Sequence, residues 1–182
     1  MDQLVAHERA QAAFARVLGA VKPDQLDSPT PCPEWTVWAV IDHVVGGNWR
    51  VAGQHEPTPE RAEALVAAHA ASASAAQSTF AAPDGLTRTY DIRIGPVPGS
   101  SFIALRTADA LVHAWDVATA TGQSTDLDPE VAEAMLDMSR QRISADFRGE
   151  GKPFGEEQEC SDDRPMAERL AAFLGRSQSA LK

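Results

Sequence analysis

Two histidines and one aspartate are spaced so that their side chains can bind one metal ion. His43 lies in the middle of the apolar segment WAVIDHVVGGNW, and His113 lies in the middle of RTADALVHAWDVATATG. Asp109 precedes His113 by four residues, and residues at i and i+4 project from the same face of an α-helix. A second helix can then supply His43 as the third ligand, as in helical-bundle metal sites. Three protein ligands leave a coordination position open to water or substrate, which is typical of catalytic zinc sites.

The same spacing also has an ordinary structural explanation. A histidine on an apolar helix face is more often a hydrogen-bonded core residue than a metal ligand, and Asp-x-x-x-His arises often by chance. Spacing alone therefore leaves both interpretations open. The remaining histidines, His7, His55 and His69, are expected to face solvent or to lie in linkers.

Several neighbours of these residues carry weaker signals. Asp116 follows His113 by three residues and is either a further ligand, a partner that orients one, or, as we favour, a bonding partner of another helix. Cys32 lies between prolines with no base beside it, which favours a buried structural thiol over a nucleophile. Arg50 can meet an anionic substrate, although a surface salt bridge is favoured. Asp42 and Asn48 flank His43, and we assign them no role in orienting ligands. The four tryptophans are expected in the core.

Helical periodicity predicts the elements that carry these residues. Thr36 is the expected cap of the helix that holds His43, and Thr58-Pro59-Glu60 has the cap, proline and acid that open a helix. The pair Gly46-Gly47 is expected to permit close packing or slight distortion. The expected helices cover residues 3–20, 36–54, 58–81, 101–120, 129–147 and 165–175, with an extended segment at 86–94. This pattern predicts a mainly α fold, a four-helix bundle with C-terminal helices, in one domain over residues 1–182.

Composition limits the classes of function. A chain of 182 residues suits one domain with a proper core. The formal net charge of -10 argues against a nucleic-acid groove and against docking on an anionic membrane. No apolar run approaches the ~20 residues of a membrane-spanning helix, and the N-terminus lacks a signal-peptide pattern. Two cysteines do not form a disulfide framework, so a reduced, cytoplasmic protein is expected.

Two segments carry a family resemblance. TPCPEWTVWAVIDHVVGGNWRVAG and LRTADALVHAWDVATATGQ resemble the N-terminal metal-binding domain of mycothiol-dependent maleylpyruvate isomerases, in the DinB-like superfamily. The ending FGEEQECSDDRPMAERLAAFLGR resembles a stand-alone branch of uncharacterised proteins in the same group. The resemblance covers nearly the whole chain, and its most specific parts are TPCPEW, the histidine of DHVVGGN, and DxLVHxWDxAxATG.

The resemblance implies a DinB-like four-helix bundle that holds one divalent ion, usually zinc with nickel as the alternative. The ligands that it implies are His43, Asp109 and His113. The characterised isomerase has a glutamate where this chain has Asp109, so the ion is expected closer to that helix. Mycothiol is the implied cosubstrate, and a small electrophile is the other partner. Homodimerisation is left open.

Two functions follow from these expectations. The first is a metal-dependent thiol transferase or isomerase, because an open position on zinc activates a bound thiol or water. The alternative is a non-catalytic metal-binding protein in stress response or regulation; an ion sealed by side chains would favour it. The characterised isomerase has a further C-terminal domain that helps to build its active site. From the length of this chain we expect weak or no turnover of maleylpyruvate.

Overall fold

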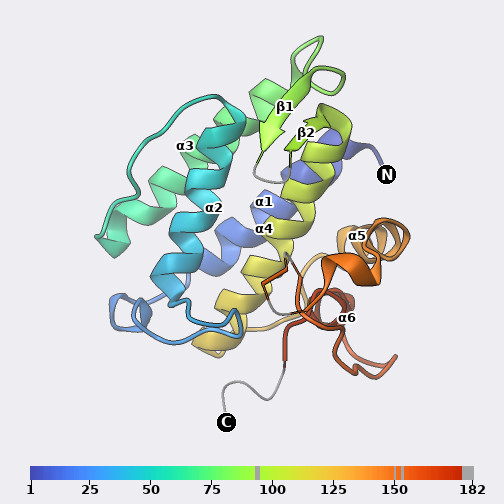
Figure 1. Ribbon diagram of the computed structural model, residues 1–182. Coiled ribbons are helices and arrows are strands. Elements are labelled where there is room, and N and C mark those ends of the chain that lie inside the picture. Colours follow the sequence, from blue (N-terminus) through green and yellow to red (C-terminus); the bar gives the residue numbers. More distant parts are fainter. Residues whose placement is uncertain (93–94, 150, 153, 178–182) are drawn as a thin grey trace.

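The computed structural model describes residues 1–92, 95–149, 151–152 and 154–177 (Figure 1). The α-helices are α1 (Gln3–Leu18), α2 (Val37–Val51), α3 (Ala62–Ala81), α4 (Gly99–Thr121), α5 (Pro129–Arg142) and α6 (Met166–Phe173). Short 3-10 helices, η1 (Pro23–Gln25) and η2 (Ala145–Phe147), and strands β1 (Thr89–Ile92) and β2 (Gly95–Pro98) complete the elements. The mainly α fold predicted from the sequence is confirmed.

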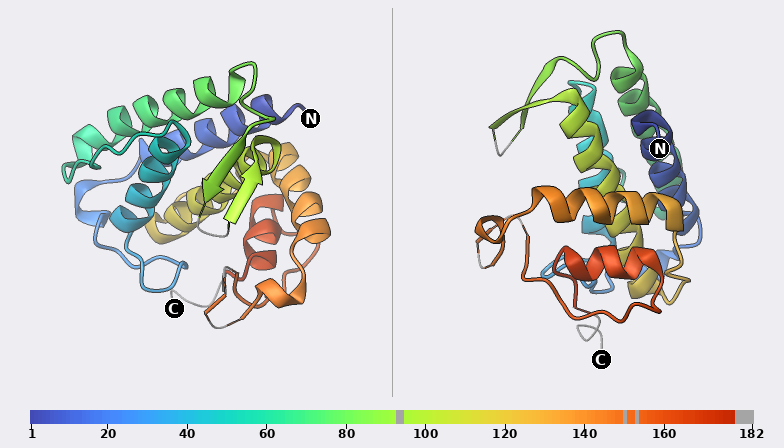
Figure 2. Two further views of the ribbon diagram at one scale, coloured as in Figure 1. Left: turned by 45° about the horizontal axis from the view of Figure 1, so that its top comes forward. Right: turned by 90° about the vertical axis from the view of Figure 1, so that its right-hand side faces the viewer.

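Helix α4 lies at the centre of the arrangement. It packs against α1 and α2, and α3 packs against the same two helices from the other side (Figures 1 and 2). The helices α5 and α6 pack against each other and against α4, and the right-hand view of Figure 2 shows both lying across the direction of the bundle helices. Helix α4 is therefore buried along most of its length, and its buried residues include the polar Arg106, Thr107, His113 and Asp116.

Local signals in the sequence fix where the helices begin and end. The Thr36 hydroxyl accepts a hydrogen bond from the backbone N–H of Ala39 at 3.2 Å, so it caps α2 as predicted. The Asp128 carboxylate does the same for the N–H of Val131 at the start of α5. Helix α4 ends at Gly122, which has a left-handed φ of 70° that glycine adopts without strain. Thr36 and Gly122 thus set the start of α2 and the end of α4, the two helices that carry the candidate ligands.

Two apolar clusters fill the interior. The larger one joins α1, α2 and α4 to α5 and α6, and its largest fully buried members include Phe14, Ile41, Leu111, Leu136 and Leu170. The smaller one lies under the β-hairpin and contains Val51, Ala76, Phe80, Phe102 and Ile103. Because α5 and α6 share the larger cluster with the bundle, the C-terminal helices are held firmly against α4. None of the described helices combines the length and hydropathy needed to cross a bilayer.

Several predicted boundaries were wrong. The third helix begins at Ala62 rather than near residue 58, because Arg61 before it is extended (φ -86°, ψ 126°). The fifth helix ends at Arg142, five residues early, since Ile143 adopts an extended conformation.

The extended segment predicted at 86–94 is shorter and has a partner. Strand β1 pairs with β2 in antiparallel register, so that Tyr90 lies opposite Val97; residues 93 and 94 lie outside the described residues. Strand β2 contains two prolines, Pro96 and Pro98. A two-stranded sheet consists of edges only, and a proline at an edge needs no ladder hydrogen bond from its missing N–H.

Candidate metal centre

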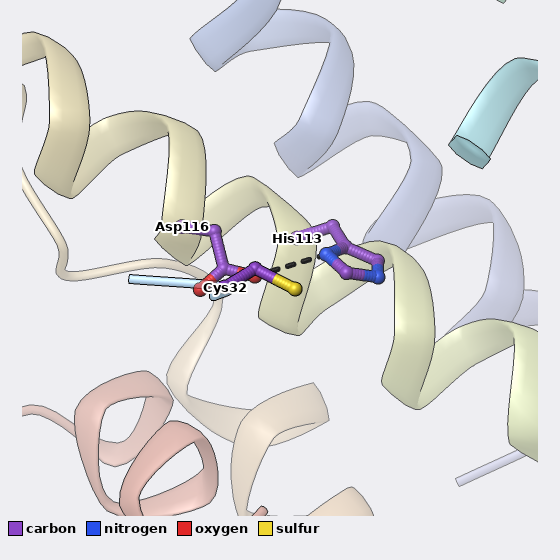
Figure 3. A group of neighbouring side chains, drawn as sticks. All are labelled: Cys32, His113 and Asp116. Atoms are coloured by element: carbon purple, nitrogen blue, oxygen red, sulfur yellow. Dashed lines mark hydrogen bonds and ion pairs between the residues drawn. The ribbon is translucent and has the colours of Figure 1, made fainter. Parts of the chain in front are cut away.

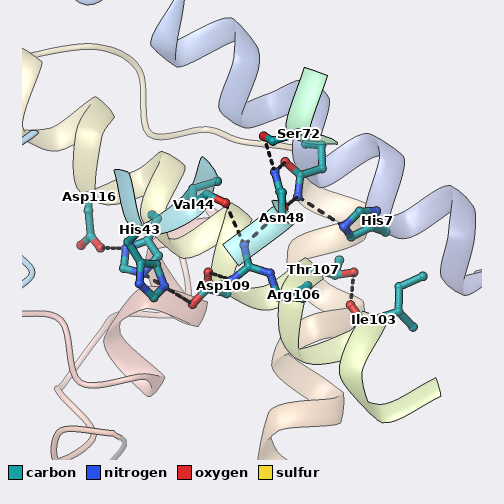
Figure 4. A network of polar contacts seen from close by, with 12 residues as sticks. His7, His43, Val44, Asn48, Ser72, Ile103, Arg106, Thr107, Asp109 and Asp116 are labelled. Carbon is teal, nitrogen blue, oxygen red and sulfur yellow. Dashed lines mark hydrogen bonds and ion pairs between the residues drawn. The ribbon is translucent and has the colours of Figure 1, made fainter. Parts of the chain in front are cut away.

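The three predicted ligands meet between α2 and α4, and Figure 4 shows His43 and Asp109 joined across the two helices. His43 comes from α2, and Asp109 and His113 come from successive turns of α4. Asp109 Oδ1 lies 3.1 Å from His43 Nε2 and 3.6 Å from His113 Nε2. The ligand atoms of all three residues lie within 4.8 Å of one another. The structure thus brings the predicted residues together, and their binding of a metal stays a prediction.

This donor set fits a divalent ion. With bonds of about 2.0–2.2 Å in a tetrahedral arrangement, ligand atoms lie roughly 3.3–3.6 Å apart. The separations of 3.1 and 3.6 Å around Asp109 Oδ1 come close to that range. Two imidazole nitrogens and one carboxylate oxygen are also the ligands of many catalytic zinc sites.

Arg106 holds the Asp109 carboxylate in place. Its Nη1 donates to Asp109 Oδ2 at 2.8 Å, and its Nη2 donates to the Val44 carbonyl at 3.1 Å and to Asn48 Oδ1 at 3.3 Å. A Cβ atom at Gly47 would lie 2.4 Å from Arg106 Nη1, so the close packing predicted at the glycine pair makes room for this guanidinium. Burial would raise the pKa of Asp109, but Arg106 and the histidines hold it well below its usual range.

Asp116 fixes the orientation of the His113 ring. Its Oδ2 lies 2.9 Å from His113 Nδ1, and an ionised carboxylate can only accept, so Nδ1 carries the hydrogen and Nε2 faces Asp109. Burial would lower the pKa of His113, but Asp109 and Asp116 together raise it to about 9. At neutral pH a cation must therefore displace a proton from Nε2. Asp116 also bonds Arg176, so it both orients a candidate ligand and joins another part of the chain.

The segment before α2 covers one side of the site. The Trp35 ring lies 4.8 Å from the His43 ring and 5.6 Å from the His113 ring, nearly parallel to the latter. Trp35 thus forms an aromatic wall beside both imidazoles.

A second candidate ligand group, Cys32, His113 and Asp116, shares His113 with the first (Figure 3). It suits a cation less well for two reasons. Burial raises the pKa of the Cys32 thiol to about 11, and the Asp116 oxygens already accept from His113 and Arg176. The expectation that Cys32 is a structural thiol therefore remains the better interpretation.

The candidate site is open on one side. The His43 side chain is 29% exposed and the Asp109 side chain 28% exposed, whereas His113 is 6% exposed. An ion between them would be anchored at the buried His113 end and would face solvent at the other. A further ligand can therefore reach it. Arg50, at the end of α2, is exposed, and the surface salt bridge that we favour for it stays a prediction, with contact to an anionic substrate as the alternative.

The expectation that His7 and His69 face solvent was wrong. Both are buried, with 0% and 2% exposure. His69 Nε2 donates to Gln11 Oε1 at 2.9 Å and stacks on Phe14, while His7 Nδ1 bonds Gln77 Oε1 at 2.6 Å. Burial lowers the pKa of both rings to about 4. The alanines and serines of α3 leave room for these rings between the helices, which periodicity in large apolar residues could not show.

These buried groups form a network that reaches the candidate ligands (Figure 4). Gln11 Nε2 donates to Asn48 Oδ1 at 3.0 Å, and the same oxygen accepts from Arg106. Asn48, which was not expected to take part in orienting ligands, thus supports the arginine that holds Asp109. The spacing of His7 and Gln11 at i and i+4 on α1 was the available signal for this network.

Comparison with known proteins agrees with the resemblance seen in the sequence. The family model of the mycothiol maleylpyruvate isomerase N-terminal domain matches residues 7–61. Uncharacterised proteins from two strains of Mycobacterium tuberculosis are 55% identical over 181 residues, which is 97% of this chain and 99% of theirs.

Solved structures of the mycothiol-dependent maleylpyruvate isomerase have the same fold. One superposes with a TM-score of 0.59 at 19% identity, covering 74% of this chain and 66% of the isomerase chain. A histidine-to-alanine mutant of the enzyme gives 0.62 at 17% identity, covering 82% and 72%. This chain thus spans about two thirds of the isomerase chain, and the shared architecture is the predicted mainly α helical bundle. The chain thus belongs to one family with these mycobacterial proteins over nearly its whole length, and its residues 7–61 belong to the family of the mycothiol maleylpyruvate isomerase N-terminal domain.

Proposed function

We propose that this protein binds one divalent ion through His43, Asp109 and His113 and uses it to activate a thiol for reaction with a small electrophile. Zinc is the proposed metal, with nickel as the alternative, and mycothiol is the proposed thiol. The observation that carries the proposal is a three-ligand donor set that is buried at His113 and open to solvent at His43 and Asp109.

The chemistry follows from charge. A divalent ion in this position would lower the pKa of a thiol bound to it, so that the thiolate forms near neutral pH. Two neutral imidazoles and one carboxylate leave one positive charge uncompensated, which favours an anionic fourth ligand. Arg106 keeps Asp109 ionised and fixed, and Asp116 keeps the His113 proton on Nδ1. The residues of this chain would thus hold the ion and orient its ligands. We assign no general acid or base.

The thiol part rests on the family. The solved relatives are described as mycothiol-dependent, and we extend that dependence to this chain as a proposal. The reaction would be thiol transfer or thiol-assisted isomerisation. We also propose a single domain in the cytoplasm, where Cys32 and Cys160 keep reduced thiols, and no nucleic-acid partner, given a net charge of -10.

The open side of the site favours this enzyme over a non-catalytic metal protein. An ion that only stabilised the bundle would be better placed among closed, fully buried ligands. Here solvent reaches two of the three ligand side chains.

The test is an assay of zinc-loaded protein with mycothiol and a panel of electrophiles that includes maleylpyruvate. Asp109→Asn keeps the side-chain shape and removes the ligand charge, while His55→Ala removes an exposed histidine outside the site as the control. We expect turnover that needs both zinc and mycothiol, is lost in Asp109→Asn and is kept in His55→Ala. Binding of zinc without any thiol binding or turnover would favour the non-catalytic alternative.

A further inference from the structure

The chain turns sharply after α6 and returns to the bundle. The N–H of Gly175 donates to the Ala172 carbonyl at 3.0 Å, and the N–H of Arg176 donates to the Ala171 carbonyl at 2.9 Å. These bonds form a Schellman motif, in which the residue after the helix adopts a left-handed conformation. Gly175 has a φ of 93°, and a Cβ there would lie 2.6 Å from the Cα of Gly155. Glycine is therefore needed twice over, for conformation and for space, and the turn sets the position of Arg176.

Arg176 reaches the buried side of the candidate metal centre. Its Nε donates to Asp116 Oδ1 at 3.0 Å and lies 3.2 Å from Oδ2. The Asp116 side chain is fully buried and that of Arg176 is 16% exposed. A buried carboxylate needs compensation by charge and hydrogen bonds, and Arg176 supplies both from 60 residues away in the sequence.

Asp116 in turn holds His113. Its Oδ2 accepts from His113 Nδ1 at 2.9 Å on the side of the ring that faces away from Asp109. Metal-binding histidines commonly donate their second ring N–H to a carboxylate, which fixes the ring and its tautomer. Arg176 is therefore linked by hydrogen bonds through Asp116 to the His113 ring. The free nitrogen of that ring, Nε2, is the one that would bind the ion.

We propose that Arg176 is a positioning residue of the metal centre, through which the C-terminal segment fixes the His113 ring by way of Asp116. This inference rests on the metal-binding part of the proposed function. The competing explanation is that the Arg176–Asp116 pair only ties the segment to the bundle. In that case its loss lowers the stability of the fold but leaves the affinity and geometry of the ion unchanged.

The experiment uses cobalt(II) as the probe, because its visible absorption reports coordination geometry as well as binding. The full chain is titrated with Co²⁺ as wild type, as Arg176→Gln and as Arg176→Lys. The control is Arg169→Gln, which removes another arginine of the C-terminal region, one paired with the exposed Asp162. We expect Arg176→Gln to bind Co²⁺ up to about 10-fold more weakly, the lower end of the effect of losing a direct partner of a metal-binding histidine, with an altered visible spectrum. Arg176→Lys should recover part of the loss, and Arg169→Gln should match wild type.

The outcomes separate the two proposals. Wild-type affinity and spectrum in Arg176→Gln would overturn the positioning role and leave the metal site standing. Failure of the wild type to bind Co²⁺ would overturn the proposed function and the positioning role with it. If circular dichroism shows that Arg176→Gln does not fold, Asp116→Asn takes its place, since it keeps shape and an acceptor oxygen but not the charge. Unchanged Co²⁺ binding in that variant would equally overturn the inference.

Discussion

The adjacent glycines of α2 offer a matched pair of substitutions that tests how the Asp109 side chain is held. A Cβ at Gly47 would lie 2.4–2.5 Å from three guanidinium atoms of Arg106, whereas a Cβ at Gly46 meets only Arg50 Nη1, at an ordinary 3.8 Å. Both changes to alanine give α2 the same gain in helix propensity, about 1 kcal/mol. They differ only in what the new methyl group displaces.

The expected magnitudes follow from these contacts. In Gly47→Ala the guanidinium must move, although it bonds Asp109, Val44 and Asn48. Overpacking a core costs about 1–3 kcal/mol, and losing hydrogen bonds to a charged group costs about 1.5–3 kcal/mol. After the propensity gain, Gly47→Ala should lower the free energy of unfolding by roughly 1.5–5 kcal/mol. Gly46→Ala should raise it by up to about 1 kcal/mol.

Urea unfolding of wild type and of both variants, followed by circular dichroism, gives the change in the free energy of unfolding for each variant. Zinc titration of the same samples shows whether the displaced Arg106 also weakens binding at Asp109, as we expect for Gly47→Ala alone. If both variants gain stability equally and bind zinc alike, the Arg106 guanidinium is not confined by Gly47 and the account of how Asp109 is held is wrong.

Three further predictions follow from the site and the buried network. Burial lowers the pKa of His7 and His69 from 6.5 to about 4, so between these pH values the unfolded chain binds more protons and stability falls as pH falls. The loss should approach roughly 3 kcal/mol per histidine at 1.36 kcal/mol per pKa unit; urea unfolding that is flat from pH 7 to pH 4.5 would contradict it. His113→Ala should lose zinc affinity while His55→Ala keeps it, and equal zinc content in the two purified variants would count against the ligand assignment. Bound Co²⁺ should quench Trp35 fluorescence, because the indole lies 4.8 Å from the His43 ring; quenching that persists undiminished in Trp35→Phe would place the ion elsewhere.

Local patterns predicted the parts of the site that depend on local geometry. The i, i+4 spacing puts Asp109 and His113 on one face of α4, and the Thr36 cap sets the start of the helix that carries His43. These features need only helix geometry and a few neighbouring residues. Helical periodicity and the family resemblance together were therefore enough to predict that the three candidate ligands lie close to one another.

Features that depend on packing between distant segments escaped prediction. His69 belongs to an alanine-rich helix that looks polar, yet its neighbours are small enough to bury it against α1. The contact of Arg176 with Asp116 spans 60 residues and depends on a glycine turn after α6. The burial of His69 and the Arg176–Asp116 contact produce no periodic pattern in the sequence, because both depend on side-chain volume and on contacts between distant segments.

The zinc content of the purified protein tests the central claim most directly. Wild type, His43→Ala and Asp109→Asn are loaded with zinc, dialysed against metal-free buffer and measured by elemental analysis, with circular dichroism to confirm folding. We expect one tightly held zinc per wild-type chain and far less in both folded variants. No retained zinc in wild type, or equal zinc in all three proteins, would contradict it.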